Sequence, residues 1–326
     1  MKGMALILMM YDHLVRTQDS VHQFIYSFHM PLFFILAGIF AKNISAIQSF
    51  KEYTRKNAKR LLLPYVVTFL MLCAWGGIQA IAKQDVGFFL KQFFSMITAT
   101  IDGYESPWGL IYAGPLWFLI ALFWVRELFY GIQRACMRLS KYKDELIVGI
   151  SFILSVISVV VRPYLPALPF SFMPAFTAIA FYAVGWYVHN HPQPWWAYVI
   201  CVVIWPLAIL YGHVEIDSCR IDYYPVSFVG ACGATYVVYL LFKLWSNVIN
   251  KINIKHQASN IVTPLTWCGV YSLPILCMHT FEMHSDLYYS VMCRIPTTYE
   301  RAWGVVIAIL FAWVILKIPY LKEVYK

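Results

Sequence analysis

Two stretches near the start of the chain decide its fold: Lys2-Gly-Met-Ala-Leu-Ile-Leu-Met-Met-Tyr-Asp-His13 and Phe24-Ile-Tyr-Ser-Phe-His29-Met-Pro-Leu-Phe-Phe34. Lys2 and His13 are eleven positions apart. At 100° per residue this offset is three turns plus roughly 20°, so both side chains lie on one helix face, about 16 Å apart along the axis. We therefore expect a cation at a membrane surface, in line with an imidazole buried in hydrocarbon.

A second imidazole, His29, lies in a stretch from Ser20 to Ala41 that contains no Asp, Glu, Lys or Arg. Ionisable groups inside a bilayer are costly and usually mark a pathway or a reaction site. Two of them on consecutive helices indicate a shared site. The alternative is that Lys2 is an interfacial anchor and His13 only caps a short membrane helix.

The composition is that of a membrane protein. Hydrophobic residues make up 61% of the chain and charged residues 13%, with a mean hydropathy of +0.64. We expect an all-α, polytopic integral membrane protein that forms a single domain over residues 1–326. About ten spans are expected, at residues 3–16, 22–41, 61–82, 113–133, 146–161, 172–189, 196–211, 223–245, 266–285 and 302–317.

The distribution of charge predicts the orientation in the membrane. The loop Lys42–Arg60 holds six basic residues against Glu52 alone, and Arg134–Lys143 holds four. The positive-inside rule places these loops in the cytoplasm. We therefore expect a protein of the plasma or inner membrane with both termini on the cytoplasmic side. This orientation explains the net charge of +9, which therefore does not indicate nucleic-acid binding. Residues 86–100 are too short and polar for a span and are expected to form an interfacial or extracytoplasmic helix.

The first span is short, with roughly fourteen apolar residues before Arg16. No small-residue cleavage site follows it, so we interpret it as a span rather than a signal peptide. Either the bilayer is thinned here or the natural start lies upstream. The eight cysteines lack metal-site spacing, and no metal is expected. Cys219 and Cys293 fall in expected external loops, where they could pair or remain thiols.

The chain resembles the acyltransferase-3 family of integral membrane proteins. Lys2-x10-His13 looks like that family's [Arg/Lys]-x10-His signature in its Lys-Gly variant, and the resemblance covers nearly the whole chain. The later blocks that match in order are Phe24–Gly38, Arg60-Leu-Leu-Leu-Pro-Tyr65, Pro115-Leu-Trp-Phe-Leu119 and Ser272-Leu-Pro-Ile-Leu-Cys-Met-His279.

The resemblance implies an acyl-coenzyme A donor, most often acetyl-coenzyme A, on the cytoplasmic side. It also implies a hydroxyl acceptor, typically on a cell-envelope carbohydrate. His13 is then expected as the general base, with His29 and His279 positioning the acceptor or stabilising the oxyanion. Lys2 and Arg60 are expected to bind the phosphates of coenzyme A. For each residue, helix packing or membrane anchoring is the alternative.

Two further residues have weaker expectations. Glu282 is three residues after His279 and could pair with it on one helix face, and Trp117 is expected in the core or the wall of the site.

A transporter or flippase of a small polar or lipid-linked substrate is the alternative function, and a membrane sensor with a degenerate site is a third. The acceptor, the acyl chain length, an acyl-histidine intermediate and a homo-oligomer stay open.

Overall fold

The structure, a computed structural model, describes residues 1–13, 20–46, 49–82, 114–137, 142–165, 170–252, 264–283 and 297–325. These residues form two compact units whose segments alternate along the chain. The first unit contains Met1–Ala41, Phe181–Ile216 and Arg220–Ser272, and the second contains Lys42–Ala180, Asp217–Cys219 and Leu273–Lys326. The single domain over residues 1–326 stays a prediction.

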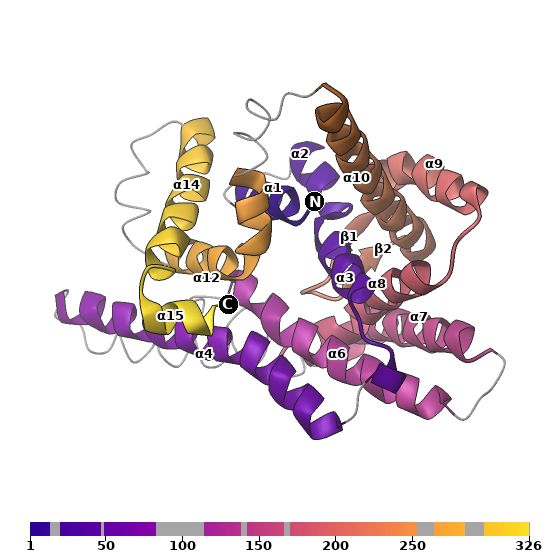
Figure 1. Cartoon of the computed structure of the whole chain (residues 1–326), viewed down its shortest axis with the longest axis horizontal. Coiled ribbons are helices and arrows are strands. Elements are labelled where there is room, and N and C mark those ends of the chain that lie inside the picture. Colours follow the sequence, from indigo (N-terminus) through magenta and orange to yellow (C-terminus); the bar gives the residue numbers. More distant parts are fainter. Residues whose placement is uncertain are drawn as a thin grey trace. The chain divides into compact units, whose positions relative to one another are not determined.

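The described residues are almost entirely helical, which confirms the all-α expectation (Figure 1). Within the described ranges, five helical stretches are long and apolar enough to cross a membrane: Ser20–Ile39, Phe50–Ile78, Gly114–Cys136, Lys143–Tyr164 and Tyr224–Trp245. The count of ten spans stays a prediction, and residues 86–100 lie outside the described residues. The helices are α1 (Lys2–His13), α2 (Ser20–Tyr26), α3 (His29–Ile39), η1 (Ile44–Ala46), α4 (Phe50–Ala82), η2 (Gly114–Leu116), α6 (Trp117–Cys136), α7 (Lys143–Val161), η3 (Arg162–Tyr164), α8 (Phe172–Asn190), α9 (Trp195–Tyr211), α10 (Tyr224–Ile252), α12 (Ser272–Met283), α14 (Thr297–Ile315) and α15 (Pro319–Val324).

The second expected span consists of two helices, α2 and α3, with a break between them. At the break, the Ser27 hydroxyl donates to the Phe24 carbonyl at 2.7 Å, and the backbone N–H of Phe28 donates to the Ile25 carbonyl at 3.2 Å. Pro31 follows in the first turn of α3, where a missing N–H costs no helical hydrogen bond. The break places His29 at the first position of α3.

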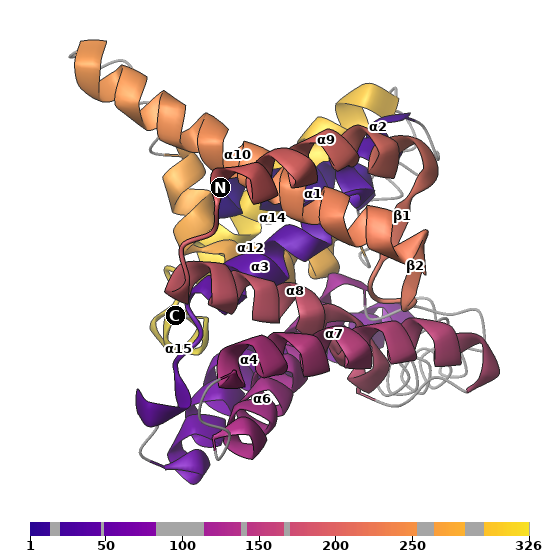
Figure 2. The same ribbon diagram turned by 90° about the vertical axis from the view of Figure 1, so that its right-hand side faces the viewer.

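Small residues bring helices of the first unit close together. A Cβ atom on Gly38 of α3 would overlap the backbone carbonyl of Tyr182 in α8, and one on Gly185 of α8 would overlap that of Ile35. Glycine at position 233 of α10 meets the backbone of α9 in the same way, and α9 and α10 lie side by side in Figures 1 and 2. Close approach through small residues is how helices associate in lipid.

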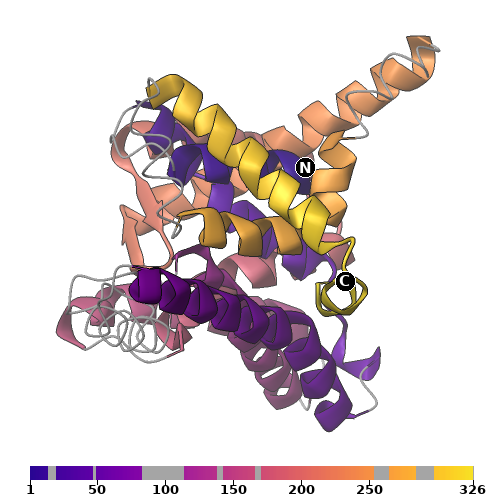
Figure 3. The same cartoon turned by 90° about the vertical axis from the view of Figure 1, so that its left-hand side faces the viewer.

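In the second unit, α4 and α6 lie side by side (Figure 2). The rings of Phe50 and Tyr53 near the start of α4 stack on Tyr130 of α6, with ring centroids 4.8 and 5.5 Å apart. Helices α12 and α14 cross each other (Figure 3), where Phe281 and Phe311 make an edge-to-face contact at 6.3 Å. These ring contacts link neighbouring helices at the edge of the unit, whereas its buried core contains mainly aliphatic side chains such as Leu61, Leu72 and Leu119.

Two elements differ from the sequence-based expectation. Helix α4 begins at Phe50, eleven residues before the expected span, because the preceding basic stretch contains no Gly or Pro to end a helix. Residues 212–222 were expected as a loop but contain a hairpin of β1 (His213–Glu215) and β2 (Arg220–Asp222), with Val214 opposite Ile221.

Candidate active site

Helix α1 keeps Lys2 and His13 in the register that their spacing predicts. The helix is continuous from Lys2 to His13, which separates the two residues by about 16 Å along the axis. Lys2 is exposed and His13 is half-buried. The start of the helix lies close to the helical residues 264–270, because a Cβ atom on Gly3 would overlap the backbone carbonyl of Leu265. The catalytic and binding roles of Lys2 and His13 stay predictions.

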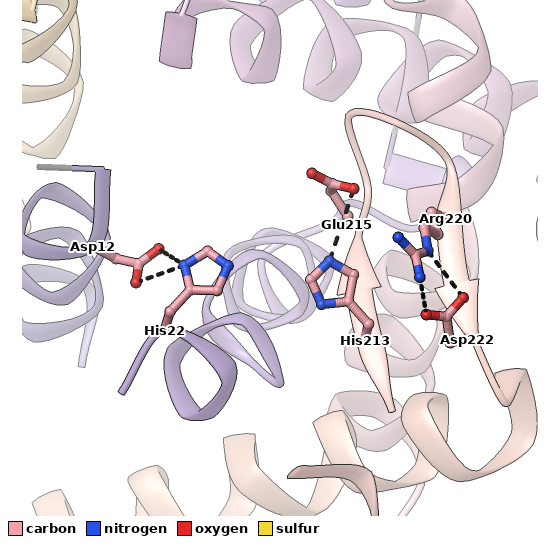
Figure 4. Close-up of polar contacts among 6 residues, drawn as sticks. All are labelled: Asp12, His22, His213, Glu215, Arg220 and Asp222. Carbon is pink, nitrogen blue, oxygen red and sulfur yellow. Dashed lines mark hydrogen bonds and ion pairs between the residues drawn. The ribbon is translucent and has the colours of Figure 1, made fainter. Parts of the chain in front are cut away.

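Asp12, the neighbour of His13, pairs with His22 of α2. Nδ1 of His22 lies 3.1 Å from Oδ1 and 3.0 Å from Oδ2 of the carboxylate. Only 2% of the Asp12 side chain and 18% of the His22 side chain are exposed. Because Nδ1 faces the carboxylate, Nε2 lies on the opposite side of the ring, toward His213 (Figure 4). The pair is a carboxylate-oriented imidazole of the kind that acid–base sites use.

His29 lies in the same part of the first unit and is 1% exposed. Its Nδ1 is 3.0 Å from the Ile25 carbonyl oxygen, so Nδ1–H donates to the backbone and Nε2 is left as an acceptor. His13 and His22 are near enough to His29 to interact with it electrostatically. His13, His29 and the Asp12–His22 pair therefore lie in one part of the first unit, and a site shared by His13 and His29 stays a prediction.

Strand β1 contributes a fourth imidazole. The His213 ring stacks on Tyr26, with centroids 5.7 Å apart and 11° between the planes, and lies 6.4 Å from the His22 ring. Nε2 of His213 is 3.8 Å from a carboxylate oxygen of Glu215 (Figure 4). Tyr26 also contacts His22 and His29, with centroids 4.1 and 4.8 Å apart, so this one tyrosine ring contacts three imidazoles.

Sequence reasoning missed His22 and His213. A carboxylate inside an apolar segment requires a partner, and this signal from Asp12 could have indicated His22, which begins the next expected span. His213 gave no comparable signal. It is 187 residues away from Tyr26 in the sequence, and only the fold brings the two rings together.

The remaining expected site residues belong to the second unit. His279 of α12 is fully buried, and Arg60 of α4 is exposed. The proposed joint site of His279 with His13 and His29 stays a prediction. Trp117 is buried at the start of α6, in agreement with a core or wall position. The Glu282 side chain lies outside the described residues, so its pairing with His279 is untested.

A polar cluster joins α4 and α6 near Arg60. The Glu127 carboxylate accepts hydrogen bonds from the Thr54 hydroxyl at 2.6 Å and from the Asn57 side-chain amide at 2.8 Å. Nη1 of Arg126 donates to Oδ1 of Asn57 at 3.2 Å. Arg60 interacts electrostatically with Arg126, so two cations lie near each other on this side of the second unit.

Cysteines and metal ligands contribute no further chemistry within the described ranges. Cys219 is a free, buried thiol, and burial raises its pKa to about 12. The choice between pairing with Cys293 and two thiols stays open, because Cys293 lies outside the described residues. No group of three or more His, Cys, Asp or Glu side chains in the described part of the chain is arranged to hold a metal ion.

A protein-family model described as an acyltransferase domain matches residues 1–317 of the chain. Searches of curated proteins and of solved structures found no match. The match covers nearly the whole chain and includes every residue of the histidine group in the first unit.

Proposed function

The chain belongs to the acyltransferase-3 family and is therefore a membrane acyltransferase, and we propose that it moves an acetyl group from acetyl-coenzyme A to a hydroxyl. In this proposal the donor is cytoplasmic and the acceptor is a carbohydrate of the cell envelope. The observation that carries the proposal is the group formed by His13, His29 and the Asp12–His22 pair, at the end of α1 opposite Lys2.

His13 acts as the general base in this reaction. Its neutral imidazole accepts the proton of the acceptor hydroxyl as the oxygen attacks the thioester carbonyl. The tetrahedral intermediate then collapses and breaks the carbon–sulfur bond. The thiolate of coenzyme A leaves and takes the proton back from the imidazolium, so the products are the ester and free coenzyme A. His13 is half-buried and its Nδ1 is enclosed, so in this proposal Nε2 is the nitrogen that accepts the proton.

His29 is better suited to holding the acceptor than to stabilising the oxyanion. An oxyanion requires a donor, whereas the Nδ1–H of His29 is already donated to the Ile25 carbonyl. Its Nε2 can accept a hydrogen bond from a hydroxyl. The oxyanion donor is then expected elsewhere, and His279 remains the proposed second-unit member of the site.

The Asp12–His22 pair supplies a second acceptor nitrogen beside His13. Asp12 holds Nδ1 of His22, so Nε2 is available on the side of the ring away from the carboxylate (Figure 4). A carbohydrate presents several hydroxyls, and Nε2 of His22 can accept a hydrogen bond from one next to the reacting group. The His213 ring lies beside it and stacks on Tyr26 through one face, so its other face can contact the apolar face of a sugar ring.

Lys2 and Arg60 bind the donor in this proposal. Both are exposed cations, and the positive-inside rule places both at the cytoplasmic surface, where coenzyme A is found. The length of about 16 Å from Lys2 to His13 suits the extended pantetheine arm, which carries the acyl group inward.

The test is an assay of purified protein in proteoliposomes with acetyl-coenzyme A and a set of cell-envelope glycans. The proposal expects free thiol release that depends on a glycan, together with an acetyl ester on that glycan. A matched reaction with malonyl-coenzyme A reports the donor preference. Acetyl transfer from a donor other than a coenzyme A thioester would contradict the donor assignment, and movement of a substrate across the bilayer without acyl transfer would indicate a transporter.

A further inference from the structure

The cluster between α4 and α6 has one acidic side chain, and each of its two oxygens accepts a hydrogen bond from α4. Glu127 accepts from Thr54 through Oε2 and from Asn57 through Oε1, at 2.6 and 2.8 Å. Asn57 in turn accepts from Nη1 of Arg126 at 3.2 Å. The result is a chain of hydrogen bonds in which Glu127 orients Asn57 and Asn57 orients the guanidinium of Arg126.

Arg126 is left with an unmet hydrogen bond. Its Nε is buried and has no hydrogen-bond partner among the described residues. A guanidinium has five N–H donors and no acceptor, and a buried donor without a partner is costly. Nε of Arg126 is therefore an open donor to which an acceptor from outside the described residues can bind.

Arg60 lies on the same side of the cluster as Arg126. It follows Asn57 by three residues and so shares its face of α4, and its charge interacts with that of Arg126. Neither arginine forms an ion pair with an acidic side chain in the ranges that the structure describes. The Glu127 carboxylate offsets only one of the two positive charges in the cluster, and an anion that contacts both guanidinium groups offsets the other.

We propose that Arg126 and Arg60 together bind a phosphate group, and that this phosphate is one of those carried by the coenzyme A donor. The inference rests on the proposed function, to which it adds a binding residue that no sequence motif indicated. Phosphate suits the pair because a guanidinium offers two parallel N–H donors that match two phosphate oxygens. Nε and one terminal nitrogen of Arg126 form such a fork. Asn57 and Glu127 act as positioning residues that hold the fork in place.

An anionic lipid headgroup has the same phosphate chemistry and is the other source of such a ligand at a membrane surface. The two sources differ in what they require besides phosphate. Coenzyme A binds from the aqueous phase and carries a 3′-phosphate that its dephospho form lacks, whereas a lipid binds through the bilayer. The experiment therefore measures both.

Calorimetry on the full-length protein in a neutral detergent compares coenzyme A, dephospho-coenzyme A and pantetheine. Arg126→Gln removes the charge and the fork, and Arg126→Lys keeps the charge but removes Nε. The matched control is Arg134→Gln, which removes one exposed positive charge from the same helix. We expect Arg126→Gln to weaken coenzyme A binding at least tenfold, Arg126→Lys to weaken it severalfold, and Arg134→Gln to leave it unchanged. Pantetheine, which has no nucleotide phosphates, should bind all four proteins alike.

Asn57→Leu provides a readout of positioning, since it retains both arginines and should still weaken coenzyme A binding. If Arg126→Gln does not give folded protein, judged by its thermal unfolding, the Arg126→Lys comparison decides. Wild-type affinity for coenzyme A in the folded Arg126 variants overturns the inference and leaves the proposed function standing. Failure of the wild-type protein to bind coenzyme A overturns the proposed donor as well.

Binding of a lipid headgroup is tested in nanodiscs with and without phosphatidylglycerol. Native mass spectrometry counts the lipid molecules that the protein retains. The inference expects the same number of retained phosphatidylglycerol molecules in wild type and Arg126→Gln. A lipid that is lost only in Arg126→Gln, with coenzyme A binding intact, would assign the site to a lipid headgroup and overturn the inference.

Discussion

Replacing His22 by leucine tests whether Asp12 and His22 stabilise the fold as a pair. The change removes the imidazole whose Nδ1 lies 3.0 Å from Oδ2 of Asp12. The carboxylate remains buried, with 2% of its side chain exposed. Because a buried carboxylate that loses its partner typically costs about 3–5 kcal/mol, we expect the free energy of unfolding to fall by an amount in that range.

Replacing the other partner, Asp12, should lower the free energy of unfolding by less. Asp12→Leu leaves the His22 imidazole, which is 18% exposed and can be neutral, so the expected loss is about 1–3 kcal/mol. The double leucine variant buries neither a charge nor an imidazole and should lie within about 1 kcal/mol of wild type. The two single changes should therefore be coupled by at least about 3 kcal/mol in a double-mutant cycle.

Thermal unfolding in detergent, followed by tryptophan fluorescence, measures these differences. At about 2–4 °C per kcal/mol, His22→Leu should lower the unfolding temperature by about 10 °C. The control is the ion pair of Arg220 and Asp222, 2.7 Å apart with side chains 62% and 36% exposed (Figure 4). Its leucine variants should change stability by less than about 1 kcal/mol. A coupling energy for the buried pair no larger than that of the surface pair would refute the reasoning.

Three further predictions concern packing, thiol chemistry and orientation. Gly38→Ala places a methyl group against the backbone of α8 and should destabilise the protein by about 1–3 kcal/mol. Gly131→Ala, with no heavy atom near the added methyl group, should stabilise it by about 0.5–1 kcal/mol. Equal changes in stability for the two variants in unfolding curves would contradict this packing. The Cys219 thiol, with its pKa raised by burial to about 12, should react slowly with iodoacetamide at pH 8, faster as the pH rises, and quickly once the protein is unfolded. In a background without native cysteines, an impermeant thiol reagent on intact cells should label a cysteine placed at Ser218 and not one at Ser49; the reverse pattern would invert the protein.

The sequence carried the main features of the fold because membrane helices are specified by local composition. Charge-free apolar stretches predicted where helices lie, and an eleven-residue offset predicted that α1 runs unbroken from Lys2 to His13. The extent of α4 was underestimated, since its first turns carry basic residues and lie outside the apolar stretch. Helix propensity continues across that boundary, and apolar length alone does not show it.

Features that depend on tertiary contacts could not be predicted from the sequence. The hairpin of β1 and β2 has strands of three residues, too short to give an alternating pattern. The stacking of His213 on Tyr26 depends on where that hairpin lies. The partners of Glu127 are likewise on another helix, about seventy positions earlier in the chain. Buried polar groups require partners, but the sequence does not say which residues these are.

Acetyl transfer by the His13→Ala variant tests the central proposal most directly. The measurement follows radioactive acetyl groups from acetyl-coenzyme A to the glycan acceptor, with His189→Ala as the control because His189 is an exposed imidazole at the end of α8. Loss of a general base typically lowers the rate by about 10²–10⁴-fold. We expect a loss of this size in His13→Ala, with unchanged coenzyme A affinity and unfolding temperature, and wild-type transfer in His189→Ala. Near-wild-type turnover in His13→Ala would contradict the assignment of His13 as the base.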